Sequence, residues 1–427
     1  MQQGARIFET LHLWSTYDYS RPADDYLHFA LRQKRYIGGS DRRAIRGLFY
    51  AMIRHQIILE EKLETVLIQT KKHPKDTFER HRWMMLIYFQ EKGYTDYLNS
   101  FNGQVHHPKK ISDVEGTILS HCPIVTLKDA SALNLTPFWY KKLKAQFGGS
   151  LAELMISLND EAPLDVRVNT LKLTRDEAIK HLKRHNISCE LLLYAPTGLR
   201  IQDKQIFPGE FIQQGLFEPQ DEGSQLITLV CNVKPGMRVV DFCAGAGGKT
   251  LGLAMQMENK GQIIASDISK VRLDRARERL RRLDLHNVII KMIDTQWLKR
   301  HGGEFDRVLV DAPCSGSGTW RRNPELKVRV GAKDLNELVQ KQRHILSQAS
   351  RLVKRGGSLI YATCSLLDDE NNDQIQWFLK SHPDFVLVDL STRHSLDTSP
   401  CHTPTWSLTP LLHKTDGFFV GCVERKA

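Results

Sequence analysis

The fold is decided by the stretch MRVVDFCAGAGGKT at residues 237–250, where an apolar strand runs into a glycine-rich turn and then into a helix. Four more apolar segments follow: GQIIASD (261–267), NVIIKMID (287–294), FDRVLVDAPC (305–314) and GGSLIYATCS (356–365). Strands this apolar, alternating with helical segments, predict a parallel sheet covered by helices on both faces. We therefore expect an α/β domain whose ligands bind at the carboxyl ends of the strands.

The residues before 219 divide into two further expected domains. Residues 1–125 are predicted to be helical, because the run after Ser40, DRRAIRGLFYAMIRHQIILEEKLETVLI, spaces its apolar residues by three and four, with Ser40 as the N-cap. Residues 126–218 contain a helix begun by Thr136 and Pro137 and ended by Gly148, then a strand in PLDVRVNTLK and a helix opened by a capping box. This mixture predicts a small α+β domain ahead of the α/β domain at 219–427.

Composition limits the classes of partner. The 427 residues carry 60 Lys and Arg against 49 Asp and Glu, a formal charge of +11 that favours a polyanionic partner. The eight cysteines form no CxxC pair and no zinc-like spacing, so we expect reduced thiols and no metal. No apolar run of 18 residues and no secretory leader pattern is found. These features predict a cytoplasmic protein without a membrane partner.

The glycine-rich turn indicates a nucleoside cofactor. A Walker loop needs glycine where Cys243 stands, and a dinucleotide fingerprint that starts at Gly245 needs glycine where Thr250 stands. The next two strand ends supply Asp267 and Asp294, whose carboxylates suit ribose hydroxyls. An adenosyl cofactor without a pyrophosphate fits this set, and S-adenosylmethionine is the expected one. The alternative is that the glycines only make a turn and the aspartates only cap helices.

Two cysteines stand at two further strand ends, Cys314 in DAPCSGSG and Cys364 in YATCS. Both thiols are expected at the sheet edge that carries the glycine-rich turn, near Asp311 and Lys249. Carbon 5 of cytosine is a weak nucleophile, and addition of a thiolate at carbon 6 makes it an enamine-like one, while Asp311 could stabilise charge on the ring nitrogens. Either cysteine alone is compatible with a buried core residue. Together they predict cytosine-5 methylation, with the role of each thiol left open.

A cytosine inside a duplex cannot offer carbon 6 to a thiolate, so the target base is expected to be unpaired or flipped out. Arg321 and Arg322 follow the fourth strand and could hold the flanking phosphates, with Trp320 as a stacking group. Arg167 and Asn169 are further candidates for a phosphate contact. The alternatives are a solvated loop with a packed tryptophan, and structural polar residues at a strand end.

The chain resembles the Sun or Fmu type of RNA cytosine-5 methyltransferases. The resemblance extends over roughly 219–423 and is carried by CAGAGGKT, ASDIS, DAPCSGSGTWRRNP, YATCS, DDEN and DGFFVG, with weaker support in RVNTLK and QDEGSQL. It implies a Rossmann-like, seven-stranded S-adenosylmethionine-dependent methyltransferase domain. It also implies that Cys364 attacks cytosine and that Cys314 helps to release the product.

The same resemblance implies the residues that contact the cofactor: Cys243, Ala244, Gly245, Ala246, Gly247, Gly248, Lys249, Asp267, Asp294 and Asp311. The sequence departs from the family at one point in this loop. Members commonly read CAAPGGKT, whereas Gly245 and Ala246 replace alanine and proline here. A less rigid turn is expected, with cofactor binding retained.

Two other functions are alternatives to cytosine-5 methylation. A methyltransferase acting on an exocyclic nitrogen commonly shows PPY or PPF at the fourth strand, but Pro313 is followed here by Cys314. A catalytically silent RNA-binding assembly factor would not need Lys249, Asp311 and both cysteines. The helical N-terminus resembles the branch that modifies small-subunit ribosomal RNA, so ribosomal RNA is the favoured substrate and transfer RNA the second. We expect a monomer without an obligate protein partner.

Overall fold

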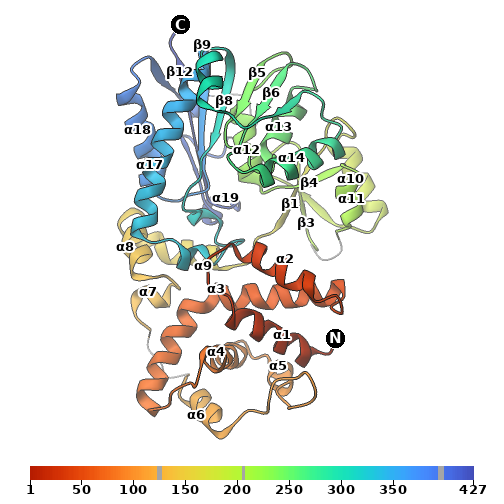
Figure 1. The fold of residues 1–427 in the computed structure, drawn as a ribbon, viewed down its shortest axis with the longest axis vertical. Coiled ribbons are helices and arrows are strands. Elements are labelled where there is room, and N and C mark those ends of the chain that lie inside the picture. The colour runs from red at the N-terminus through yellow and green to blue at the C-terminus, as the bar shows by residue number, and fades with distance from the viewer. Residues whose placement is uncertain (123–126, 204–206, 393–398) are drawn as a thin grey trace. The chain divides into compact units, whose positions relative to one another are not determined.

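The computed structural model describes residues 1–122, 127–203, 207–392 and 399–427. The chain forms two compact units, the first from Met1–Asp160 with Trp320–Gly331 and the second from Glu161–Thr319 with Ala332–Ala427 (Figure 1). The boundary expected at 125/126 lies outside the described residues. Residues 127–160, expected with the α+β domain, belong to the helical unit, as does a short segment that the α/β domain was expected to keep.

The first unit is helical, as the sequence predicts. Its helices are α1 (Gln3–Ser15), α2 (Ala23–Gln33), α3 (Gly39–Thr70), α4 (Thr77–Glu91), α5 (Thr95–Asn99), α6 (Asp113–His121), α7 (Asp129–Ala132), α8 (Pro137–Phe147), α9 (Leu151–Asn159) and α16 (Leu326–Arg329). Their apolar faces enclose a core that includes Trp14, Phe49 and Phe89, all without exposed surface.

The predicted caps of α8 are present, whereas the predicted N-cap of α3 is not. Thr136 accepts the Trp139 N–H at the start of α8, and Gly148 ends that helix with φ of 53°. The prediction that Ser40 caps α3 is wrong, because the helix already begins at Gly39 and its N-cap is Gly38. The loop before α3 thus ends two residues earlier than the serine suggests. In the described chain, no helix is long and apolar enough to cross a membrane.

The second unit begins with a small antiparallel sheet of order β2-β3-β1-β4. Its elements are β1 (Leu164–Val168), α10 (Arg175–Arg184), β2 (Cys189–Leu191), β3 (Gly198–Ile201), α11 (Gly209–Gln213) and β4 (Phe217–Pro219). The predicted capping box is present, since Thr174 accepts the Glu177 N–H and the Glu177 carboxylate accepts the Thr174 N–H. Val166, Leu182 and Phe217 close the core between this sheet and its helices.

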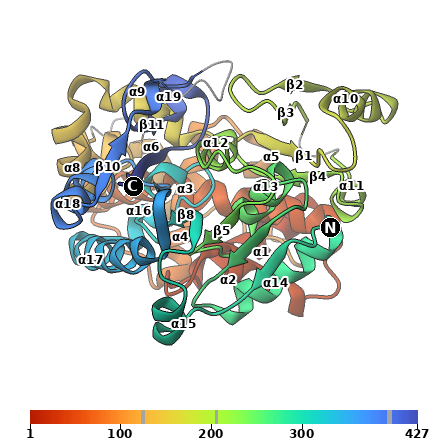
Figure 2. The same ribbon diagram turned by 90° about the horizontal axis from the view of Figure 1, so that it is seen from above.

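A larger sheet of order β10-β12-β9-β8-β5-β6-β7 makes up the rest of this unit, with β11 paired to β12. Its strands are β5 (Arg238–Asp241), β6 (Gln262–Ala265), β7 (Val288–Ile290), β8 (Phe305–Asp311), β9 (Val353–Thr363), β10 (Phe385–Val388), β11 (Trp406–Leu408) and β12 (Phe418–Arg425). Strands β5 to β9 pair in parallel and β12 is antiparallel, as predicted. The strand order reverses between β5 and β8, which lie side by side in Figure 2. Ligands of open α/β sheets bind at this switch point.

Helices cover both faces of the large sheet because consecutive strand residues point to opposite sides. Val239 belongs to an apolar cluster that contains residues of α12 (Glu222–Val230), α13 (Gly248–Gln256) and α14 (Lys270–Arg282). Val240 belongs to a second cluster, with residues of α15 (Thr295–Arg300), α17 (Ala332–Ala349) and α18 (Asn372–Ser381). The apolar residues of β5 are therefore all buried. Polar groups that could bind a ligand lie at the carboxyl end of the strand, where the glycine-rich turn starts.

Candidate active site

The glycine-rich turn joins β5 to α13 and needs glycine at two positions. Gly245 and Gly247 have φ of 55° and 83°, in the left-handed region that favours glycine. A Cβ on Gly247 would also meet the Cβ of Ala276 at 3.1 Å, so α14 can pack close to the turn. The turn is anchored to β6 by the Ala244 N–H, which donates to the Ser266 carbonyl at 2.7 Å. The departure from the family sequence thus places a glycine where the backbone is left-handed.

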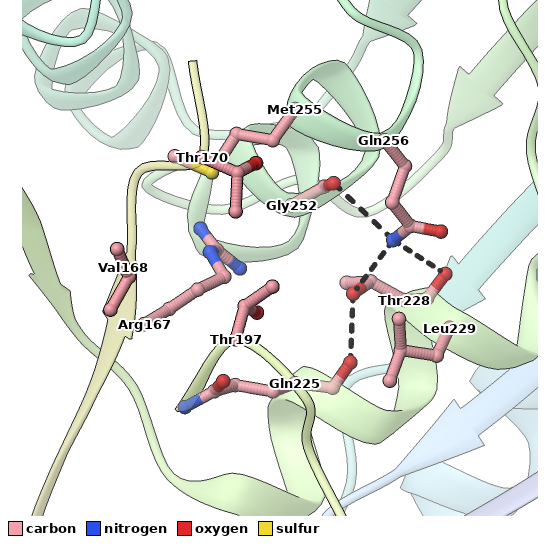
Figure 3. A pocket seen from close by; sticks show the side chains of 10 residues that line it. All are labelled: Arg167, Val168, Thr170, Thr197, Gln225, Thr228, Leu229, Gly252, Met255 and Gln256. Atoms are coloured by element: carbon pink, nitrogen blue, oxygen red, sulfur yellow. Dashed lines mark hydrogen bonds between the residues drawn. The ribbon is translucent and has the colours of Figure 1, made fainter. Parts of the chain in front are cut away.

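Two arginines from other elements hold the carbonyls of this turn. Arg279 on α14 donates to the Ala246 carbonyl at 2.8 Å, and Arg167 on β1 donates to the Gly248 carbonyl at 3.1 Å. Figure 3 shows Arg167 among the residues that line a small pocket, which include Gly252. A Cβ on Gly252 would lie 2.6 Å from the Arg167 guanidinium, so this glycine makes room for the arginine. The small antiparallel sheet and α14 therefore both support the turn.

The strand-end acids lie beside the turn. Asp267 accepts the N–H groups of Gly245 at 3.0 Å and Ser269 at 2.8 Å, and Asp294 caps α15 by accepting the Trp297 N–H at 2.7 Å. Both carboxylates thus have the structural role that the sequence left open, and each oxygen keeps a second lone pair for a ligand.

The residues at this edge fit an adenosyl cofactor. Directly after Asp267, Ile268 exposes 82% of its surface, and Met292, two residues before Asp294, exposes 53%. Large exposed apolar side chains next to acids offer a nucleoside both a face for its base and acceptors for its ribose hydroxyls. No phosphate-binding loop is needed for such a ligand.

Lys249 and Asp311 form a partly buried ion pair at the switch point. Their Nζ and Oδ2 atoms are 2.7 Å apart, and the two side chains expose 10% and 31% of their surface. Burial opposes the charge of the amine, but the attraction of Asp311 outweighs it and holds the pKa of Lys249 above its ordinary value. The Cys364 sulfur is near enough to contribute to the same shift. A fixed positive charge therefore lies close to that thiol.

The two strand-end cysteines come together, with 3.4 Å between the Cys314 and Cys364 sulfurs. The hydrogen bond with Cys364, together with burial, raises the pKa of the Cys314 thiol well above its ordinary value. Burial likewise raises the pKa of Cys243 in the turn, which makes that thiol a poor nucleophile. Within the described ranges, no group of three or more His, Cys, Asp and Glu side chains could hold a metal ion.

The candidate RNA contacts are placed differently from the expectation. Trp320 has no exposed surface and packs edge-on against Trp139 at 5.0 Å between ring centroids, so its predicted stacking on a base is wrong. Asn169 is fully buried and donates to the Gly215 carbonyl at 2.8 Å. Arg167 is 3% exposed and Arg321 8%.

Two of these polar side chains bind backbone carbonyls within the protein. Arg167 donates to the Gly248 carbonyl of the glycine-rich turn, Asn169 donates to the Gly215 carbonyl, and Arg321 is buried within the helical unit. A phosphate contact by Arg167, Asn169 or Arg321 does not agree with such burial. Arg322 is half-buried, and its contact with RNA stays a prediction.

Sequence reasoning missed Arg279 and the turn after β9. The helix that carries Arg279 was expected only to cover the sheet. It contains many arginines, and the sequence does not show which of them binds the glycine-rich turn. The turn after β9 contributed the segment DDEN to the family resemblance, but no role was predicted for its residues. Its Glu370 is fully buried and accepts the Ser315 N–H at 2.8 Å.

Fold and site together define a class. A Rossmann-like sheet whose switch point carries a glycine turn, strand-end acids and no phosphate loop is the architecture of S-adenosylmethionine-dependent methyltransferases. The model of the family described as 16S rRNA methyltransferase RsmB/F matches residues 228–424, and that of the ferredoxin-like domain of RsmF/B-like methyltransferases matches 136–206. The chain belongs to the RsmB/F family of 16S rRNA methyltransferases.

Individual relatives agree with this assignment. Ribosomal RNA small subunit methyltransferase B of Photorhabdus laumondii is 33% identical over 304 residues, which cover 69% of this chain and 68% of the relative. The Shewanella oneidensis protein of the same name is 33% identical over 289 residues, 66% of this chain and 65% of the relative. The match thus spans about two thirds of these curated relatives. The crystal structure of PH0851 has a TM-score of 0.77 at 27% identity and covers 99% of this chain and 98% of that chain.

Proposed function

We propose that this protein transfers a methyl group from S-adenosylmethionine to carbon 5 of a cytosine in RNA, through a covalent bond between Cys364 and the base. The observation that carries the proposal is the 3.4 Å separation of the Cys314 and Cys364 sulfurs beside the Lys249–Asp311 pair. A single cysteine at a strand end is compatible with a core residue. Addition to carbon 6 needs one thiolate, and a second thiol in contact with it is placed to assist the later elimination.

The chemistry follows from the cytosine ring. The Cys364 thiolate adds to carbon 6, and the electrons of the C5–C6 double bond move towards ring nitrogen 3, where the Lys249 ammonium, held in place by Asp311, can stabilise the negative charge. Carbon 5 then takes the methyl group, which S-adenosylmethionine supplies when bound. A water molecule takes the carbon 5 proton, the electrons of that C–H bond restore the C5–C6 double bond, and the Cys364–C6 bond breaks so that the thiolate leaves.

The assignment of roles is supported by the environment of each thiol. The raised pKa of Cys314 keeps it protonated, so it suits a hydrogen-bond donor or proton carrier better than a nucleophile. Lys249, whose raised pKa owes part of its shift to Cys364, holds a positive charge near that sulfur. Cys364 is therefore the proposed nucleophile and Cys314 the group that assists release.

The proposed substrate is ribosomal RNA, because the curated relatives are named as small-subunit ribosomal RNA methyltransferases. The net charge of +11 is consistent with a polyanion. Transfer RNA stays the second candidate. The cytoplasmic location, the monomeric state and the contact of Arg322 with RNA stay predictions from the sequence.

A trapping experiment tests this proposal. Cys314→Ala protein is incubated with S-adenosylmethionine and small-subunit ribosomal RNA, and complexes that survive denaturation are separated on a gel. We expect the adduct to accumulate with Cys314→Ala, to vanish when Cys364→Ala is added to it, and to be unaffected when Cys189→Ser is added instead. Absence of a Cys364-dependent adduct, or mass spectrometry that finds the new methyl group on the exocyclic nitrogen, would refute the mechanism.

A further inference from the structure

The turn that follows β9 places two consecutive polar residues, Glu370 and Asn371, in the interior of the second unit. Glu370 has no exposed surface and Asn371 is 3% exposed. Burial of a carboxyl and an amide is unfavourable unless their hydrogen bonds are made. The partners of these two residues therefore show what the turn is built to hold.

Glu370 grips the loop that carries Cys314. One carboxylate oxygen accepts the Ser315 N–H at 2.8 Å and the Gln342 amide at 2.9 Å, and the other accepts the Ser315 hydroxyl at 2.5 Å. Gln342 also donates to the Pro313 carbonyl at 3.0 Å. The residues on both sides of Cys314 are thus fixed, one directly by Glu370 and the other through Gln342.

Asn371 grips the loop that carries Cys364. Its amide N–H donates to the Ser365 carbonyl at 2.9 Å, and its amide oxygen accepts the Thr363 hydroxyl at 2.6 Å. The residues on both sides of Cys364 are fixed in this way. The two loops also meet directly, since the Ser315 and Ser365 hydroxyls are 3.2 Å apart.

We infer that Glu370 and Asn371 are positioning residues that together set the distance between the two catalytic thiols. Because they are neighbours in the chain, a displacement of one loop is resisted by the residue that holds the other. Backbone held on both sides of a cysteine fixes the position of its Cβ, so the two sulfurs can separate only by rotation of a side chain and not by movement of a loop. The contribution to catalysis rests on the proposed function, whereas the effect on the thiol spacing does not.

Thiol spacing can be measured without RNA or cofactor. Phenylarsine oxide bridges two neighbouring thiols: two As–S bonds form, and the arsenic-bound oxygen leaves as water with the two thiol protons. A single thiol binds it only weakly. Its dissociation constant, measured by titration with intact-mass detection of the bridged protein, therefore reports how well the two sulfurs are held together. Cys314→Ala gives the baseline for one thiol.

Three variants remove hydrogen bonds between the turn and the cysteine loops while they keep the side-chain volume and both thiols. Glu370→Gln lacks the second carboxylate acceptor, Asn371→Asp lacks the amide donor, and Thr363→Val loses the hydroxyl that Asn371 binds. Asn372→Ala is the matched control, because Asn372 bonds to the side chains of Asp368 and Thr405 and to neither cysteine loop.

We expect phenylarsine oxide to bind the wild type and Asn372→Ala equally within about twofold, and the three variants at least about tenfold more weakly, the effect of losing one buried hydrogen bond to a polar or charged group. In methyl transfer, kcat falls by a similar factor while the dissociation constant of S-adenosylmethionine changes by less than about twofold. Unchanged binding of S-adenosylmethionine also shows that the variants are folded. The isosteric Thr363→Val keeps the test valid where a charge or amide change disturbs folding.

The outcomes separate this inference from the proposed function. Wild-type affinity for phenylarsine oxide in all three variants overturns the inference, as does a wild type that binds no better than Cys314→Ala. Weaker arsenical binding with no adduct in the trapping experiment supports the positioning role and refutes only the cysteine mechanism. A fall in arsenical affinity and in kcat together supports both.

Discussion

Asp241 at the end of β5 gives a stability prediction whose size follows from the structure. Its carboxyl is fully buried, and one oxygen accepts the Thr250 hydroxyl at 2.6 Å while the other has no hydrogen-bond partner among the described residues. Burial raises the pKa of Asp241 from 3.8 to about 7. The folded chain therefore holds a proton over a pH range in which the unfolded chain has released it, and stability falls as the pH rises from about 4 to about 7.

The perturbation is Asp241→Asn, which keeps an acceptor for Thr250 and cannot ionise. Linkage between these two pKa values gives a cost of about 2 kcal/mol at pH 5 and about 4 kcal/mol at pH 8 for the wild type. The variant avoids this cost but leaves an amide N–H without a partner, which costs about 1 kcal/mol. Asp241→Asn is thus expected to raise the free energy of unfolding by about 1 kcal/mol at pH 5 and about 3 kcal/mol at pH 8.

The assay has to follow the second unit alone, because two units need not unfold together. Cys422 lies on β12 of the same sheet and has no exposed surface. Its labelling by a pyridyl disulfide, which reacts at both pH values, across a urea series gives the unfolding curve of that unit. A difference between variant and wild type that is the same at pH 5 and pH 8 would show that Asp241 does not titrate as argued.

Two further predictions each have a neighbouring arginine as control. Arg279→Met removes the hydrogen bond to the Ala246 carbonyl, so calorimetry is expected to show S-adenosylmethionine binding about tenfold more weakly, whereas the exposed Arg277→Met leaves it unchanged; equal affinities would contradict the role of Arg279. Arg82→Met leaves a buried glutamate without its cation and is expected to lower the free energy of unfolding of the helical unit by about 3 kcal/mol. Arg80→Met breaks only partly exposed pairs and should cost under about 1 kcal/mol. Similar losses for the two variants in urea denaturation would show that burial does not set the cost of breaking the Arg82–Glu115 pair.

The site was predictable as far as local chemistry reaches. The strand ends at Asp267, Asp311 and Cys364 were readable because apolar strands end where polar residues begin, and parallel strands bring those ends to one edge. The nearness of the two thiols followed from the same rule. The sulfur–sulfur distance of 3.4 Å depends on hydrogen bonds from the turn after β9. In the sequence this turn looks like any other acidic loop.

The buried polar residues mark where sequence reasoning stopped. Arg167 and Asn169 look like phosphate ligands at a strand end, and Trp320 looks like a stacking group after a catalytic motif. The sequence does not show whether a polar side chain binds a ligand or a backbone carbonyl from a distant part of the chain. Arg167 meets Gly248, 81 positions away, and that partner exists only when β1 and α13 have packed.

Four features were predictable from the sequence: the parallel pairing of the central strands, the glycine-rich turn, the helical N-terminus and the placement of both cysteines at strand ends. Each of these depends on apolar periodicity or backbone conformation within a few residues. Three features became apparent only in the folded chain: which arginines bind the glycine-rich turn, the burial of Trp320, and the hydrogen bonds of Glu370 and Asn371 to the two cysteine loops. These features depend on hydrogen bonds between buried groups that are far apart in the chain, and local sequence patterns do not predict such pairs.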